Sequence, residues 1–200
     1  MSSESDSPAN SAAPQITQLL RSAAAGNNAA LGEVYATLYP ELKRMAHAAL
    51  YRQGRADALQ TTVLVHESFL RLVANHGFKI EDRRHFFAYA ARTMRNLIID
   101  NAREQLAQWR GGDVEHVTYT AEYAAQMVQA GDELMRVDQA LRELEAMDPE
   151  LCELVEMRYF GGYTETEVAE LLGISDRTVR RRWDKARAWL YVALSEGQDG

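Results

Sequence analysis

The sequence has little of what builds cross-links, membrane spans or secretion signals. It contains a single cysteine, Cys152, which excludes a disulfide within the chain. No apolar run approaches the roughly 18 residues that a membrane span needs, and the first residues lack the basic and then apolar pattern of a secretion signal. We therefore expect a cytoplasmic chain without a membrane span, in which Cys152, surrounded by leucine and valine, is a core residue.

Residues arranged for catalysis or metal binding are also lacking. His66 and Glu67 begin like a zinc-protease motif, but Leu70 stands where that motif needs its second histidine. The remaining histidines and Cys152 do not have the spacing of metal ligands. The sequence thus predicts no enzymatic activity, no metal site and no cofactor.

The charges are distributed very unevenly along the chain. The formal net charge of -7 argues against a DNA-binding protein if it is taken alone. Residues 113–158 contain twelve acidic residues and three arginines, however, whereas residues 55–112 contain nine basic residues and six acidic ones. A second basic cluster follows between residues 177 and 187. Two cationic segments therefore flank an acidic middle.

Apolar residues recur at helical spacing through most of the chain, and no convincing β-hairpin signal interrupts them. Breaks at residues 26–28, near Gly54 and at residues 75–77 divide the front part into four helices, the second of which contains Pro40. We predict an all-α fold of two small helical bundles joined by a flexible acidic linker. The predicted boundaries are a disordered tail at 1–14, a front bundle at 15–109, the linker at 110–131, a rear bundle with a helix-turn-helix at 132–195, and a tail at 196–200.

Capping signals near the C-terminus predict the helix-turn-helix. Thr164 and Glu167 form a capping box at the start of its first helix. Gly173 supplies the left-handed residue that ends this helix, and Ser175 caps the next one. Val179 begins an apolar stripe on the second helix, with basic residues opposite. The stripe consists of Val179, Trp183, Ala186 and Leu190.

The basic face of this second helix is suited to a DNA groove, because arginine can bond guanine edges or neutralise phosphates. The alternative is a solvated basic face on an ordinary helical hairpin. Residues near the start of a recognition helix reach the bases first. We therefore predict base contacts from Arg177, Thr178 and Arg181, and phosphate contacts from Arg180, Arg182 and Lys185.

Two helices of the front bundle carry further signals. The helix predicted at about 83–106 has Phe86 and Phe87 on one side and arginines on the other, a combination that suits single-stranded nucleic acid. The alternatives are plain core phenylalanines and a solvated arginine surface. The helix at about 59–73 is apolar over most of its circumference, with a narrow polar strip at Glu67 and Arg71. Either another protein covers its apolar shoulders, or it is a central helix buried on several sides.

Three segments, taken in order, carry a family resemblance. Residues 64–72 read LVHESFLRL, residues 85–92 read HFFAYAAR, and the helix-turn-helix begins GYTE at Gly162 and contains LGIS at its turn. From about Ile16 to Leu194 the chain resembles bacterial sigma factors of the sigma-70 family, extracytoplasmic-function (ECF) group. The three segments are similar to the core-polymerase-binding segment, the upstream-melting helix and the region-four helix-turn-helix of that group.

The resemblance implies promoter-specific transcription initiation with core RNA polymerase and promoter DNA as partners. The rear bundle would read the minus-thirty-five element and touch the polymerase flap, and the linker would lie along the polymerase channel. The front bundle would bind the polymerase clamp helices, and it would melt the minus-ten element with the loop before His85 (residues 75–82) and the helix face that carries Arg92 and Asn96. The implied clamp contacts are Leu64, Glu67, Ser68, Leu70 and Arg71, and the implied minus-ten contacts are Arg83, Arg84, His85, Tyr89, Arg92, Arg95, Asn96 and Arg103.

Both modules are expected to present their arginines to solvent, and arginines that face inward onto carboxylates would contradict this interpretation. The alternative function is a stand-alone helix-turn-helix regulator that binds operator DNA as a dimer. The sequence leaves open whether an anti-sigma protein binds the chain.

Overall fold

The computed structural model describes residues 9–51, 58–74, 82–111 and 121–196. These residues form helices and no strand, which confirms the all-α prediction. The helices are α1 (Ala9–Ala24), α2 (Asn28–Tyr51), α3 (Ala58–Ala74), α4 (Arg83–Gly111), α5 (Ala121–Met147), α6 (Pro149–Tyr159), α7 (Glu165–Leu172) and α8 (Asp176–Glu196).

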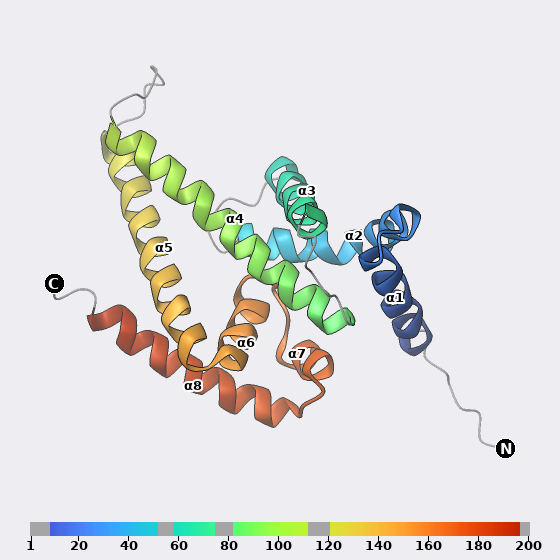
Figure 1. Ribbon diagram of the computed structural model, residues 1–200. Helices are drawn as coiled ribbons and strands as arrows, with labels where there is room; N and C mark the ends of the chain where they lie inside the picture. The colour runs from blue at the N-terminus through green and yellow to red at the C-terminus, as the bar shows by residue number, and fades with distance from the viewer. Residues whose placement is uncertain (1–8, 52–57, 75–81, 112–120, 197–200) are drawn as a thin grey trace.

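The long helix α4 is the centre of the arrangement (Figure 1). Helices α2 and α3 pack against one side of it, and α5 and α6 pack against the other. Helices α4 and α5 lie close at one end and diverge, with α6 between their open ends (Figure 1). Helix α8 crosses beneath and contacts α5, α6 and α7. The front and rear helices therefore pack against each other through α4.

The predicted capping groups are all present in the helix-turn-helix. The backbone N–H of Glu167 donates to Thr164 Oγ1 at 3.2 Å, and the Thr164 N–H donates to Glu167 Oε2 at 2.7 Å. Gly173 has a left-handed backbone with φ of 64° at the C-terminus of α7. The N–H of Thr178 donates to Ser175 Oγ at 3.2 Å at the start of α8. These bonds satisfy backbone groups that helix ends leave without partners.

A shared core joins the two halves. Tyr163 comes from the turn between α6 and α7, yet its ring lies 6.0 Å from that of Phe87 on α4, centroid to centroid. Its hydroxyl donates to Glu41 of α2 at 3.1 Å. Gly162 has φ of +68°, and a Cβ there would overlap the side chain of Ala48. Glycine is needed at this position both for the backbone and for the close approach of α2.

Two predicted boundaries differ from the structure. Helix α1 begins at Ala9, within the stretch predicted as a disordered tail, because alanines favour helix there. The predicted linker at 110–131 contains the end of α4 and the first residues of α5, and only residues 112–120 lie outside the described part. Gly131, which was read as the end of the linker, lies inside α5 with Leu106 of α4 against it. The contact between α4 and α5 explains how a weakly patterned segment becomes helical.

Candidate nucleic-acid interfaces and partner surface

The second helix of the helix-turn-helix has the two faces that its sequence predicts. Val179 and Ala186 are fully buried, and Trp183 packs against the core. The guanidinium carbon of Arg158 lies 4.3 Å from the centre of the Trp183 ring, and this arginine also pairs with Glu165 of α7 at 3.2 Å. Arg158 thus holds α8 against α6 and α7, a positioning role that sequence reasoning missed because its partners are distant in the chain.

The basic side chains of α8 point outward and differ in how they are paired. Arg177 and Arg181 are exposed and form no ion pair within the described residues. Arg180 pairs with Glu165 at 3.1 Å, and Arg182 pairs with Glu150 at 3.1 Å. The Thr178 hydroxyl lies 2.9 Å from that of Ser175 and therefore takes part in the helix cap. Arg177 and Arg181 are consequently the most accessible of the predicted base-reading residues.

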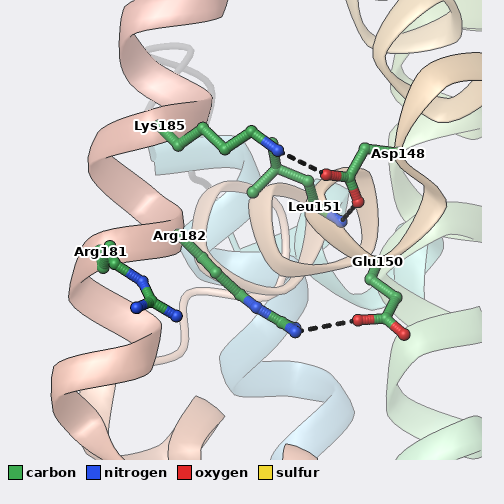
Figure 2. A pocket seen from close by; sticks show the side chains of 6 residues that line it. All are labelled: Asp148, Glu150, Leu151, Arg181, Arg182 and Lys185. Atoms are coloured by element: carbon green, nitrogen blue, oxygen red, sulfur yellow. Dashed lines mark hydrogen bonds and ion pairs between the residues drawn. The ribbon is translucent and has the colours of Figure 1, made fainter.

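A shallow pocket of about 360 Å³ lies between α8 and the start of α6 (Figure 2). Arg181, Arg182 and Lys185 line one wall, and Asp148 and Glu150 line the other. Lys185 Nζ lies 2.9 Å from Asp148 Oδ2, and this hydrogen bond lowers the pKa of the Asp148 carboxyl. These pairs are local to the rear helices and remain open to solvent, so they hold the basic side chains only weakly.

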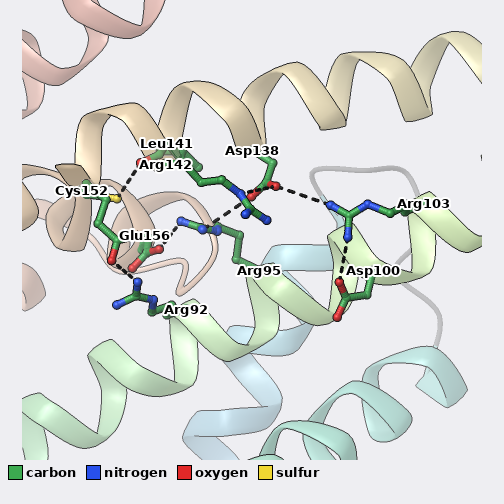
Figure 3. A network of polar contacts seen from close by, with 10 residues as sticks. Arg92, Arg95, Asp100, Arg103, Asp138, Leu141, Arg142, Cys152 and Glu156 are labelled. Atoms are coloured by element: carbon green, nitrogen blue, oxygen red, sulfur yellow. Dashed lines mark hydrogen bonds and ion pairs between the residues drawn. The ribbon is translucent and has the colours of Figure 1, made fainter. Parts of the chain in front are cut away.

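Arginines of α4, unlike those of α8, pair with carboxylates from the other half of the chain. Arg95 is only 3% exposed and lies between two carboxylates from other helices (Figure 3). Its guanidinium donates to Glu156 of α6, and it lies 3.5 Å from Asp138 of α5. The Asp138 and Glu156 side chains are themselves only 6% and 7% exposed. Arg95 therefore cannot contact DNA in this arrangement.

Three more arginines of α4 reach carboxylates on α5 or α6. Arg84 pairs with Glu153 at 3.2 Å, and Arg92 donates to Glu145. Arg103 lies 3.8 Å from Asp138 and 3.4 Å from Asp100 of its own helix (Figure 3). The remaining predicted arginine contact, Arg83, pairs with Glu41 of α2 at 2.8 Å.

The expectation that the front arginines face solvent is wrong for Arg95, whereas Arg92 and Arg103 pair with carboxylates and still remain 47% and 55% exposed. The acidic residues of α5 and α6 lie next to them, because opposite charges attract where these helices pack against α4. The prediction that these arginines contact DNA stays a prediction and requires the interface to open. Of the other predicted minus-ten residues, His85 is exposed, Tyr89 and Asn96 are half-buried, and residues 75–81 lie outside the described part.

Burial also changes the acid–base properties of this interface. It raises the pKa of Glu156 to about 7, an effect that the charges of Arg95 and Arg92 only partly oppose. It likewise raises the pKa of Cys152 to about 12. The Cys152 thiol lies 3.4 Å from the carbonyl oxygen of Leu141, among core residues as predicted. A thiol of this kind is unreactive.

Helix α3 has one buried face and one exposed face. Leu64 and Ser68 are buried, and Ser68 Oγ donates to the Leu64 carbonyl at 2.6 Å. Leu70 is 59% exposed and Val63 is 52% exposed, on the same side of the helix. Glu67, Arg71 and Val73 complete this exposed surface, which we call the α3 face. Of the five predicted polymerase contacts, Leu64 and Ser68 thus point into the core, because helical spacing directs them to the opposite side.

A family model described as ECF sigma factor matches residues 13–196 of the sequence. The chain belongs to the ECF sigma factor family. It is therefore a sigma factor, which directs transcription initiation together with core RNA polymerase and promoter DNA. A search among curated proteins found no match. The family resemblance drawn from three short segments is confirmed over almost the whole chain.

The sigma factor carries its basic and apolar surfaces on separate helices. The described residues include no helix long and apolar enough to cross a membrane. They also include no group of three or more histidine, cysteine or acidic side chains placed to hold a metal ion. The surfaces with a recognisable chemistry are the outer side of α8, the paired arginines of α4 and the α3 face.

Proposed function

We propose that this sigma factor binds the promoter at two places, with α4 on the minus-ten element and α8 on the minus-thirty-five element. The exposed outer side of α8 supports the second assignment. Arg177 and Arg181 extend from the first turns of a helix whose inner stripe packs against the core, and such a helix can enter the major groove with its N-terminal turns foremost. Arg180, Arg182 and Lys185 lie along the same helix and can neutralise phosphates at the groove edge.

The α3 face is proposed as the docking surface for the polymerase clamp helices. Val63 and Leu70 supply exposed apolar area at positions seven residues apart, on one side of the helix. Glu67 and Arg71 flank them with charges that can fix the register of a partner helix. A helix that leaves apolar side chains of this size in solvent is suited to a partner surface. The rear bundle is proposed to touch the polymerase flap.

The minus-ten element is proposed to melt because α4 binds the separated strand better than the duplex. Arg92, Arg103 and His85 can follow phosphates of a single strand once the arginines are uncovered, and Tyr89 can stack on an extruded base. Differential affinity for the melted state is sufficient to shift the equilibrium toward open DNA, so this step needs no nucleotide hydrolysis. The observation that carries the whole proposal is the family match, together with exposed surfaces on α8 and α3, which lie on opposite sides of α4 (Figure 1).

Run-off transcription from a mapped promoter tests the proposal. Adding the protein to core RNA polymerase is expected to produce a transcript of defined length, whereas the protein alone is expected to bind duplex promoter DNA weakly. Transcription that does not change on addition, together with tight binding of duplex DNA by the free protein, would contradict the proposal. That result would favour a stand-alone operator-binding regulator.

The α3 face has its own test. Leu70→Asp places a charge in the centre of the exposed apolar surface, and we expect at least about a tenfold loss of affinity for core polymerase, the equivalent of about 1.4 kcal/mol. Tyr51→Asp at the end of α2 is the matched control, because Tyr51 is 71% exposed and lies on a helix to which the proposal assigns no polymerase contact. Equal losses for both variants in a pull-down with core polymerase would mean that the docking surface is assigned to the wrong helix.

A further inference from the structure

We infer that the acidic residues of α5 and α6 hold the free sigma factor in a closed state, in which its own rear half covers the surface proposed to melt DNA. This surface consists of Arg84, Arg92, Arg95 and Arg103 on α4, and we call it the α4 cationic face; Arg95 is enclosed, and the other three are paired with carboxylates and partly exposed. The acidic cover consists of Asp138, Glu145, Glu153 and Glu156. This inference rests on the proposed role of α4 in binding the minus-ten strand.

The acidic cover resembles a strand of phosphates in its chemistry. The α4 cationic face runs from Arg84 to Arg103, a length of about 28 Å at 1.5 Å per residue. Along that length each guanidinium meets a carboxylate of another helix, as it would meet successive phosphates of a bound strand. The basic segment at residues 55–112 and the acidic segment at residues 113–158 thus face each other in the folded chain.

Closure and DNA binding exclude each other at this surface. Arg95 is enclosed by Asp138 and Glu156, so a nucleic acid can reach it only after α5 and α6 have moved away. A ligand that binds only the open state is weakened by the fraction of molecules that are open. The closed state therefore lowers the affinity of the free chain for single-stranded DNA.

The interface has features of a contact that can open. The ion pairs at Arg84, Arg92 and Arg103 are partly exposed, and such pairs add little stability. The buried pairing around Arg95 is incomplete, since Arg95 Nε and Asp138 Oδ1 have no hydrogen-bond partner among the described residues. Desolvation of buried charges opposes their attraction, and incomplete pairing increases that cost. The apolar contacts at Tyr163 also hold the two halves together, so polymerase binding must supply contacts that compensate for their loss when the interface opens.

The α3 face stays accessible while the α4 cationic face is covered. Helix α3 packs on the side of α4 away from α5 and α6 (Figure 1), and Leu70 is 59% exposed in the closed state. Core polymerase can therefore dock first on the closed chain, and the opening that exposes the arginines follows on the enzyme. This order restricts strand binding to sigma factor that is already attached to polymerase.

The test uses the full chain and a pair of charge reversals. The double variant Glu145→Arg with Glu153→Arg places like charges opposite Arg92 and Arg84. The matched control is Glu133→Arg with Glu143→Arg, which changes the net charge by the same amount. Both positions are exposed on α5, and their carboxylates accept hydrogen bonds from glutamines of the same helix. Circular dichroism verifies that each variant keeps its helix content. If the charge-reversal variant loses helix content, the charge-neutralising variant Glu145→Gln with Glu153→Gln is used in its place.

Two measurements are made on each free protein. Small-angle X-ray scattering gives the radius of gyration, which we expect to increase for the interface variant and to stay at the wild-type value for the control. Fluorescence anisotropy with a random-sequence single-stranded oligonucleotide gives the affinity, which we expect to rise at least about tenfold above that of the control. Equal radii and equal affinities for the two variants would overturn the inference. An increased radius without the gain in affinity would also overturn it, since the covered surface would then not be the DNA-binding one.

Failure of the inference and failure of the proposed function are distinguishable. Run-off transcription with core polymerase reports the function of the wild-type protein whatever the state of its free form. If the wild type produces a transcript but the interface variant does not open, the proposed function is supported and the closed state is contradicted. If the interface variant opens and binds single-stranded DNA more tightly but the wild type produces no transcript, the closed state is supported and the proposed role in initiation is contradicted.

Discussion

Two arginine-rich helices of this sigma factor have opposite surroundings. On α8, Arg177 and Arg181 extend into solvent, and Arg182 and Lys185 pair only with carboxylates of the adjacent α5–α6 turn and the start of α6. On α4, Arg95 is enclosed by carboxylates of two helices that belong to the other half of the chain. The same residue type thus serves as an exposed recognition group in one region and as an interface group in the other. The neighbouring charges decide which role an arginine takes.

The largest expected effect is on α4, where removal of Arg95 tests its role as an interface group. Arg95→Ala leaves Asp138 and Glu156 buried without their partner, and we expect the free energy of unfolding to fall by about 3–5 kcal/mol. Urea denaturation followed by circular dichroism measures this quantity. Arg181→Ala on α8 is the control and is expected to change it by less than about 0.5 kcal/mol. Similar losses of unfolding free energy for the two variants would mean that arginines of α4 and α8 do not differ in their contribution to stability.

Arg181→Ala tests the other side of the contrast. The exposed guanidinium is predicted to read a base edge, so its loss is expected to reduce discrimination between the correct promoter and one with a changed minus-thirty-five base by about 1–3 kcal/mol. Competition run-off transcription with the two templates measures this discrimination, and a pull-down with core polymerase is the control. Unchanged discrimination would mean that Arg181 contacts phosphate or no DNA at all.

The buried interface should respond to pH in a way that the exposed helix does not. The pKa of Glu156 is raised to about 7 in the closed state, so protonation favours closure. Arg95 and Arg92 of α4 oppose the shift, and Glu145 and Glu153 add to it. This contribution to stability is fully present below the ordinary glutamate pKa and is lost as the pH rises through about 7. The wild type is therefore expected to gain about 1 kcal/mol of stability between pH 8 and pH 6 that Glu156→Gln does not gain.

Urea denaturation of both proteins at the two pH values measures the difference. The subtraction of the Glu156→Gln result removes the contribution of histidines and other groups common to both proteins. Parallel pH profiles would show that Glu156 is charged across this range, with its attraction to Arg95 outweighing burial.

The smallest effect is expected for an exposed pair on the rear helices. Lys185→Ala removes the partner of Asp148 at a solvent-open site, and we expect a change in unfolding free energy below about 0.5 kcal/mol. Asp148→Ala is expected to cost about 1 kcal/mol, because Asp148 also accepts from the Leu151 N–H as the cap of α6. Equal costs for the two variants would mean that the ion pair, and not the cap, is the stabilising feature.

Local chemistry made the helix-turn-helix predictable. The capping box at Thr164 and Glu167, the left-handed Gly173 and the stripe beginning at Val179 involve residues within a few positions of one another. The all-α fold and the break between α1 and α2 follow from the same short-range patterns, and the predicted breaks near Gly54 and at residues 75–77 lie outside the described residues. The exposed apolar residues of α3 were also visible in the sequence, as an excess over what one buried face can hold.

Longer-range features were not predictable in the same way. Periodicity identified Phe86 and Phe87 as one side of α4 but did not reveal that arginines on its other side pair with carboxylates of α5 and α6. Leu64 and Ser68, two of the implied polymerase contacts, are buried in this structure, and the sequence did not show this because an apolar helix gives little indication of which side packs. The segment 121–131 was read as linker although it is helical, since its helix depends on contact with α4.

The sequence by itself determined the helices, their caps, the recognition helix and the separation of charge into basic and acidic segments, because each depends on residues close together in the chain. Only the tertiary structure decided that the acidic segment lies on the basic face of α4 and leaves that of α8 open. The pairing of Arg95 with Asp138 and Glu156 joins positions 43 and 61 residues apart. Electrostatic attraction acts through space, so the partner of a charge is settled by how the helices pack and not by their order.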